Sequence, residues 1–194
     1  MNVRLLRTIA IAAVGAIVLS SCGSSDSPVA PQSAIAPNAA ASSSLLGLTA
    51  TTVTPLQRTK PLATSLSTSA YIGALGGKLA IPGAGITVVV PPLALTSTKL
   101  VTVTALAGSN VAYEFEPHGT TFLVPLVVTQ DLRNTQASSG GLINPLSLFV
   151  GYFPDDKNIL SVTELLNVNL NLLNQTAIFT VTHFSGYIVA SGRD

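Results

Sequence analysis

The chain has 194 residues, of which 47% are hydrophobic and 9% charged, so its composition excludes a wholly disordered polymer and predicts one domain with tails. The formal net charge is +1, and the sequence has no cluster of Lys and Arg. Because nucleic-acid binding depends on cations that neutralise rows of phosphates, nucleic acid is not an expected partner. The only cysteine, Cys22, leaves no pair for an internal disulfide, so the fold must be stabilised by its core.

The first 21 residues have the layout of a signal peptide. Arg4 and Arg7 form a short basic start, and residues 8–20 are mainly apolar and carry no charge. This apolar stretch is shorter than the ~20 residues that a transmembrane helix needs. We therefore predict that residues 1–21 are cleaved rather than kept as a membrane span.

The leader ends in Leu19-Ser20-Ser21-Cys22, which resembles the lipobox of bacterial lipoproteins. The resemblance implies that the Cys22 thiol receives a diacylglycerol and that the new amino terminus is acylated, for example by palmitate. Several acyl chains anchor a protein durably, so the membrane is the expected partner of this end. Gly23 stands where inner-membrane lipoproteins tend to have aspartate, which favours the outer membrane of the cell envelope. The alternative is a secreted protein with a chance cysteine near the cleavage site.

Residues 22–70 are interpreted as the lipidated cysteine and a flexible, disordered tether. Residues 23–44 consist mainly of Ser, Ala, Pro and Gly, with Asp26 as the one charge and no apolar periodicity. Residues 45–70 are ambiguous, because an apolar group between 45 and 53 could form a short strand but is surrounded by Thr, Ser and Pro. If all of residues 23–70 are coil, the root-mean-square span of this tether is roughly 40 Å.

From Tyr71 onward the sequence changes to short runs of Val, Ile, Leu, Thr and Phe divided by Gly, Pro, Asn and Asp. This spacing is typical of an all-β sandwich or barrel. The Leu-rich residues 165–173 alternate with Asn, so a strand is favoured there over a helix. We predict that residues 71–194 form an antiparallel β-sandwich. Its expected strands cover 78–81, 86–90, 100–106, 111–115, 123–129, 146–153, 165–173, 177–181 and 187–190.

Two segments rich in Gly and Pro carry a resemblance to a known family. They are GGKLAIP at 76–82, continued by GITVVVPP at 85–92, and EPHGTTF at 116–122, followed by PLVVT at 125–129. These segments resemble the ZU-five domain, a β-sandwich module of ankyrins, zonula-occludens proteins and netrin receptors that has relatives in bacterial surface proteins. The match covers about residues 76–132, and Leu93 stands where the family usually has glycine. The resemblance implies a module for protein contacts that uses no cofactor.

The tripeptide His183-Phe184-Ser185 lies where some eukaryotic members of this family cleave themselves. The resemblance implies that Ser185 attacks the carbonyl of Phe184, with His183 as general base, and that water splits the resulting ester. The alternative is a strand end at which Phe184 fills the core, His183 faces a neighbour and Ser185 begins a turn. We favour the alternative, because a three-residue motif is short and the strain that cleavage needs cannot be read from sequence.

Other candidate sites are weaker. His118 is flanked by Pro and Gly and is expected at a turn, and a metal shared by His118 and His183 is not predicted because Glu114 and Glu116 are not at a ligand spacing. Residues 154–158 lack the ligand series of a calcium loop. The sequence has no phosphate-binding loop and no nucleophile elbow.

These observations favour a non-enzymatic, lipid-anchored protein of the cell envelope whose sandwich binds an unidentified protein. A self-cleaving domain and a ligand-binding surface domain are the alternatives. A ligand-binding domain would need a pocket with converging polar groups, which the sequence does not reveal.

Overall fold

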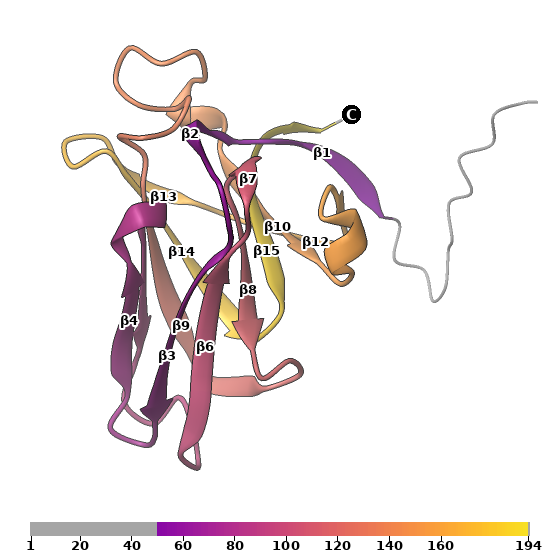
Figure 1. Ribbon diagram of the computed structural model, residues 1–194. Helices are drawn as coiled ribbons and strands as arrows, with labels where there is room; N and C mark the ends of the chain where they lie inside the picture. The colour runs from indigo at the N-terminus through magenta and orange to yellow at the C-terminus, as the bar shows by residue number, and fades with distance from the viewer. Residues whose placement is uncertain (1–49, 194) are drawn as a thin grey trace, which may run out of the picture. The chain divides into compact units, whose positions relative to one another are not determined.

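The computed structural model describes residues 50–193 (Figure 1). The chain divides into two units, 1–40 and 41–194, and the described residues all belong to the second. Their regular structure is β apart from three short 3₁₀ segments, which confirms the predicted all-β class. Among residues 50–193, no helix is long and apolar enough to cross a membrane. The leader, Cys22 and the tether up to residue 49 lie outside the described residues.

Short strands account for most of the regular structure between residues 50 and 193. In chain order, the strands and 3₁₀ segments are β1 (Thr51–Pro55), β2 (Gln57–Leu62), β3 (Leu66–Ile72), β4 (Gly77–Ile81), η1 (Pro82–Ala84), β5 (Ile86–Val90), β6 (Lys99–Ala105), β7 (Gly108–Asn110), β8 (Ala112–Glu116), β9 (Thr121–Asp131), η2 (Pro145–Ser147), β10 (Phe149–Phe153), η3 (Asp156–Asn158), β11 (Ser161–Val162), β12 (Glu164–Leu166), β13 (Asn169–Asn171), β14 (Thr176–His183) and β15 (Gly186–Arg193).

Two antiparallel sheets pack against each other, as the predicted sandwich requires. The larger has the order β11-β1-β15-β8-β6-β3, and β10 and β12 branch from β15. The smaller has the order β13-β14-β9-β5-β4, and β2 and β7 form a separate two-stranded ribbon. Every strand pair is antiparallel. Consecutive strands often change sheet, so segments that are distant in the chain meet in one core.

The core forms where period-two alternation turns apolar side chains inward. In β5, Ile86, Val88 and Val90 are each 1% exposed, and in β6 Val101 and Val103 are equally enclosed. Enclosing an aliphatic side chain of this size contributes about 1.5–3 kcal/mol. The two hydrophobic clusters of the domain lie entirely between residues 53 and 190. The unit 41–194 therefore contains a complete core of its own.

The start of the domain corrects the predicted boundary at residue 71. Strands β1, β2 and β3 all begin before Tyr71, and β3 pairs with β6 over its whole length. The stretch resembles a linker because its outward face is made of Ser and Thr. Those hydroxyls join the strands instead, since Ser67 bonds Thr104 and Ser69 bonds Thr102, each at 2.8 Å. Residues 51–70 are thus part of the sandwich and not of a tether.

Two further predictions are corrected in detail. The strand expected over 165–173 is divided between β12, which pairs with β10, and β13, which pairs with β14 in the other sheet. The expected strand over 146–153 begins at Phe149, because residues 145–147 form η2. A turn precedes β14, with Gln175 in the left-handed region at a φ of 50°.

Candidate functional site

The His183-Phe184-Ser185 segment is the connection between the two sheets. Strand β14 ends at His183 in the smaller sheet, and β15 begins at Gly186 in the larger. The Phe184 amide donates to the Thr120 carbonyl at 2.8 Å, and the Ser185 carbonyl accepts from the Phe115 amide at 3.0 Å. Hydrogen bonds to two different neighbours therefore fix the crossover.

Phe184 is a core residue. Its side chain is 1% exposed. Its ring meets that of Phe122 edge-on, with centroids 4.6 Å apart, and stacks beside that of Phe115 at 6.1 Å. Aromatic pairs in these geometries contribute about 0.5–1.5 kcal/mol beyond the area they bury. The crossover is thus anchored by an aromatic group that belongs to the packing of the domain.

The His183 imidazole contacts Tyr187 and Glu164, and so it is not placed to act as a general base for Ser185. Its Nδ1 lies 3.4 Å from the Tyr187 hydroxyl, and its Nε2 lies 3.6 Å from a carboxylate oxygen of Glu164. The Tyr187 hydroxyl donates to the His183 carbonyl at 2.8 Å. Burial raises the pKa of Tyr187, and the negative charge of Glu164 adds to the effect. No hydrogen bond in the described part of the chain joins the His183 imidazole to the Ser185 hydroxyl.

The Phe184 carbonyl, which Ser185 would attack in self-cleavage, accepts one backbone hydrogen bond. The Gly119 amide donates to the Phe184 carbonyl oxygen at 3.3 Å, where negative charge would develop during attack. Between residues 50 and 193, only Leu93 and Gln175 are non-glycine residues with a positive φ, so the crossover holds no left-handed strain. The segment offers an oxyanion donor and a nucleophile, but its base is turned toward other partners.

His118 lies in an acidic hollow whose residues come from two separate parts of the sequence. The hollow brings His118 together with Glu114, Glu116, Asp155 and Asp156. Burial raises the pKa of Glu114, and the nearby charge of Asp156 raises it further. No group of three or more His, Cys, Asp or Glu side chains among residues 50–193 is arranged to hold a metal ion.

One end of the sandwich carries exposed apolar side chains. Here the β3–β4 turn, the β5–β6 loop and the start of β9 lie together, at the lower end of the view in Figure 1. We call this surface the apolar loop end; it consists of Tyr71, Leu75, Leu93, Leu100 and Leu123. Leu75 is 93% exposed, Tyr71 78% and Leu123 73%. Contiguous exposed apolar groups mark interaction surfaces, and the segments that carry these five side chains are neighbours in the hydrogen-bond pattern.

Backbone hydrogen bonds hold the apolar loop end together. The Leu93 amide donates to the Ala74 carbonyl at 2.8 Å, and the Leu123 amide donates to the Ala94 carbonyl at 3.2 Å. Leu93 has a φ of 65°, in the region that favours glycine. Leu93 thus has an exposed apolar side chain on a backbone conformation that is unfavourable for leucine. Sequence reasoning missed this surface, although Leu75 beside Gly76 and Leu93 after two prolines are apolar residues in turn positions.

The class of the protein follows from the fold and these surfaces: an antiparallel β-sandwich with a buried aromatic crossover and an exposed apolar end. No model of a known protein family matches the chain, and no curated protein sequence matches it. The functional conclusion therefore depends on the sequence and the geometry of the chain itself.

Proposed function

We propose that the protein is a cell-envelope lipoprotein, anchored through Cys22, whose β-sandwich is a protein-interaction module. The observation that carries the proposal is the apolar loop end, which we take to contact an apolar surface of an envelope protein. The lipobox-like leader supports the anchor, and the resemblance to ZU-five domains supports the role of the module. Leu93 adds to that support, because its positive φ falls where the family usually has glycine.

The energetics of the apolar loop end suit binding to a protein. Each leucine that becomes buried at an interface contributes about 1.5–3 kcal/mol, and exposed tyrosines such as Tyr71 are common anchors. Association also costs ~4–15 kcal/mol of rotational and translational freedom. Because the loops are already joined by backbone hydrogen bonds, little additional ordering is needed. Several of these side chains acting together can therefore support a stable contact.

The proposal is tested by comparing two double variants in the native envelope. Leu75→Ser with Leu123→Ser removes apolar groups from the apolar loop end. Leu142→Ser with Leu173→Ser is the matched control, because those leucines are 91% and 96% exposed in other loops. After gentle detergent extraction and native electrophoresis, we expect the wild type and the control in a complex larger than the monomer, and the loop-end variant as a monomer. A monomeric wild type, or equal loss in both variants, contradicts the proposal.

Self-cleavage is a second candidate, favoured by the Gly119 amide beside the Phe184 carbonyl. The Ser185 hydroxyl would attack that carbonyl carbon, and the bond to the Ser185 nitrogen would break to leave an ester and a free amine. Water would then split the ester, so the products end at Phe184 and begin at Ser185. Intact mass spectrometry decides: two fragments that disappear in Ser185→Ala support this candidate, and one full-length species rejects it.

A further inference from the structure

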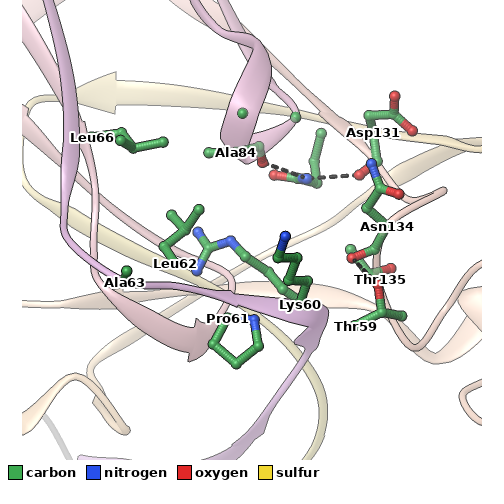
Figure 2. A pocket seen from close by; sticks show the side chains of 14 residues that line it. Thr59, Lys60, Pro61, Leu62, Ala63, Leu66, Ala84, Asp131, Asn134 and Thr135 are labelled. Carbon is green, nitrogen blue, oxygen red and sulfur yellow. Dashed lines mark hydrogen bonds between the residues drawn. The ribbon is translucent and has the colours of Figure 1, made fainter.

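A cavity of about 480 Å³ lies between the strand β2 and the η1 turn (Figure 2). Figure 2 shows Lys60 and Leu62 below Ala84 and Asp131, with Leu66 at the upper left. Its volume is in the range of small-molecule sites. The wall combines apolar side chains with two cationic ones, and the residues that matter below are Arg58, Lys60, Leu62, Leu66, Gln130 and Asp131.

Arg58 is the most unusual group in this wall, because its side chain is charged and the residue is only 7% exposed. Its Nη1 donates to the carbonyls of Leu106 at 3.3 Å, of Gly108 at 3.4 Å, and of Asn110. Its Cζ lies 5.8 Å from the centre of the Tyr113 ring. These contacts fix the guanidinium from one side.

The other edge of this guanidinium is unused. Nε and Nη2 of Arg58 are shielded from solvent and have no hydrogen-bond partner among residues 50–193. These two nitrogens form the edge that matches both oxygens of a carboxylate in a bidentate contact. A buried donor without an acceptor destabilises a fold, and a buried charge does so more strongly. An unused carboxylate-binding edge inside a domain therefore indicates a ligand.

The described residues supply no anion for Arg58. The acidic residue of the wall is Asp131, but its carboxylate is held by Arg133, with Nη2 and Oδ2 2.6 Å apart. The hydrogen bond from Arg133 lowers the pKa of Asp131. Gln130 is also engaged, since its amide donates to the carbonyls of Asp131 at 2.7 Å and Ala84 at 3.3 Å. Arg58 therefore adds two N–H donors without acceptors to the wall of the cavity.

We propose that this cavity binds a small carboxylate that carries a short apolar body. Nε and Nη2 of Arg58 hold its two oxygens, Lys60 adds a second positive charge, and Leu62 and Leu66 contact the apolar part. The ligand reaches the shielded edge when Lys60 and Pro61 shift outward. The pairing of β2 with β7 is made at Gln57 and Leu62 and is interrupted between them, so Lys60 and Pro61 can move without breaking it. This site is separate from the apolar loop end and does not depend on the proposed protein contact.

The test uses the unit 41–194, which has a complete core, with hexanoate as the probe. Nuclear magnetic resonance follows the Nε–H signal of Arg58 during titration at pH 7. We expect a saturable shift with a dissociation constant of about 1 mM or below. Hexanamide, which has the same apolar body without the charge, is expected to bind at least 10-fold more weakly. Absence of saturable binding of hexanoate up to 50-fold above ~1 mM overturns the proposal.

Variants assign the binding to the cavity. Arg58→Met is expected to weaken hexanoate at least 10-fold, and Arg193→Met, which removes an exposed arginine elsewhere, is expected to leave it unchanged. If Arg58→Met does not fold, Lys60→Met replaces an exposed residue of the wall and is expected to weaken binding about 3-fold. Equal affinity in the wild type and in either wall variant overturns the assignment. Sulfate that binds as tightly as hexanoate overturns the preference for a carboxylate with an apolar body.

Discussion

Replacing Phe184 by alanine tests whether the crossover is a packing element of the core. The ring is 1% exposed and contacts the rings of Phe115 and Phe122. Large-to-small substitutions at sites of this kind cost about 3–5 kcal/mol, which includes the transfer of the ring and the cavity left behind. Because the Phe184 amide bonds Thr120 through the backbone, that hydrogen bond survives the change. We therefore expect a loss of about 3–5 kcal/mol in the free energy of unfolding.

Urea denaturation of the unit 41–194 measures this loss. Its midpoint should fall while the dependence of free energy on urea stays constant, since the fold and its buried surface are otherwise kept. The control is Phe149→Ala, because Phe149 is only partly buried and packs beside Arg193. The control should lose less than half as much. If Phe184→Ala costs below about 1 kcal/mol, the crossover is not anchored by its ring and the packing argument is wrong.

Single residues give three further predictions. Burial raises the pKa of Tyr113 from 10 to about 12, although the charge of Arg58 opposes the rise. The neutral Tyr113 side chain therefore contributes its full share of the free energy of unfolding below pH 10, and this share is lost as the pH rises toward 12. Tyr113→Phe should remove about 2 kcal/mol of that alkaline loss between about pH 9 and 11.5, measured by urea denaturation, whereas exposed Tyr71→Phe should not. Gly151→Ala would place a Cβ 2.4 Å from a methyl of Val162 and should lower the melting temperature; an unchanged value contradicts this crowding. Cys22→Ala should abolish metabolic labelling with a fatty acid, and full labelling of that variant would disprove the anchor.

Local patterning predicts the strands with a clear apolar period. The prediction for β5 matches its observed bounds, because Ile86 to Val90 alternate in burial and the flanking Gly85 and Pro91 set its ends. The predictions for β4 and β6 agree to within one residue for the same reason. β3 was not predicted from the sequence, because Ser67 and Ser69 on its outward face and Thr68 between them resemble a linker. Only the partner strand β6, some 30 residues later in the chain, gives those hydroxyls their role.

The candidate sites are less predictable, because they depend on contacts between distant residues. Arg58 lies in the stretch that composition assigns to a tether, and its burial requires the carbonyls of residues 106 to 110. Likewise, nothing in the sequence singles out Leu75 and Leu123, which come together only when the β3–β4 turn, the β5–β6 loop and the start of β9 meet. The His183-Phe184-Ser185 segment stands out in the sequence, but the direction of the imidazole depends on Glu164 and Tyr187.

The contact made by the apolar loop end is tested most directly by photocrosslinking in living cells. A photoreactive amino acid replaces Leu75 in the full chain, and the same replacement at Lys157, an exposed position in η3, is the comparison. The account predicts one discrete adduct with an envelope protein from position 75 and none from position 157. Equal adducts from both positions, or no protein adduct from position 75, would contradict it.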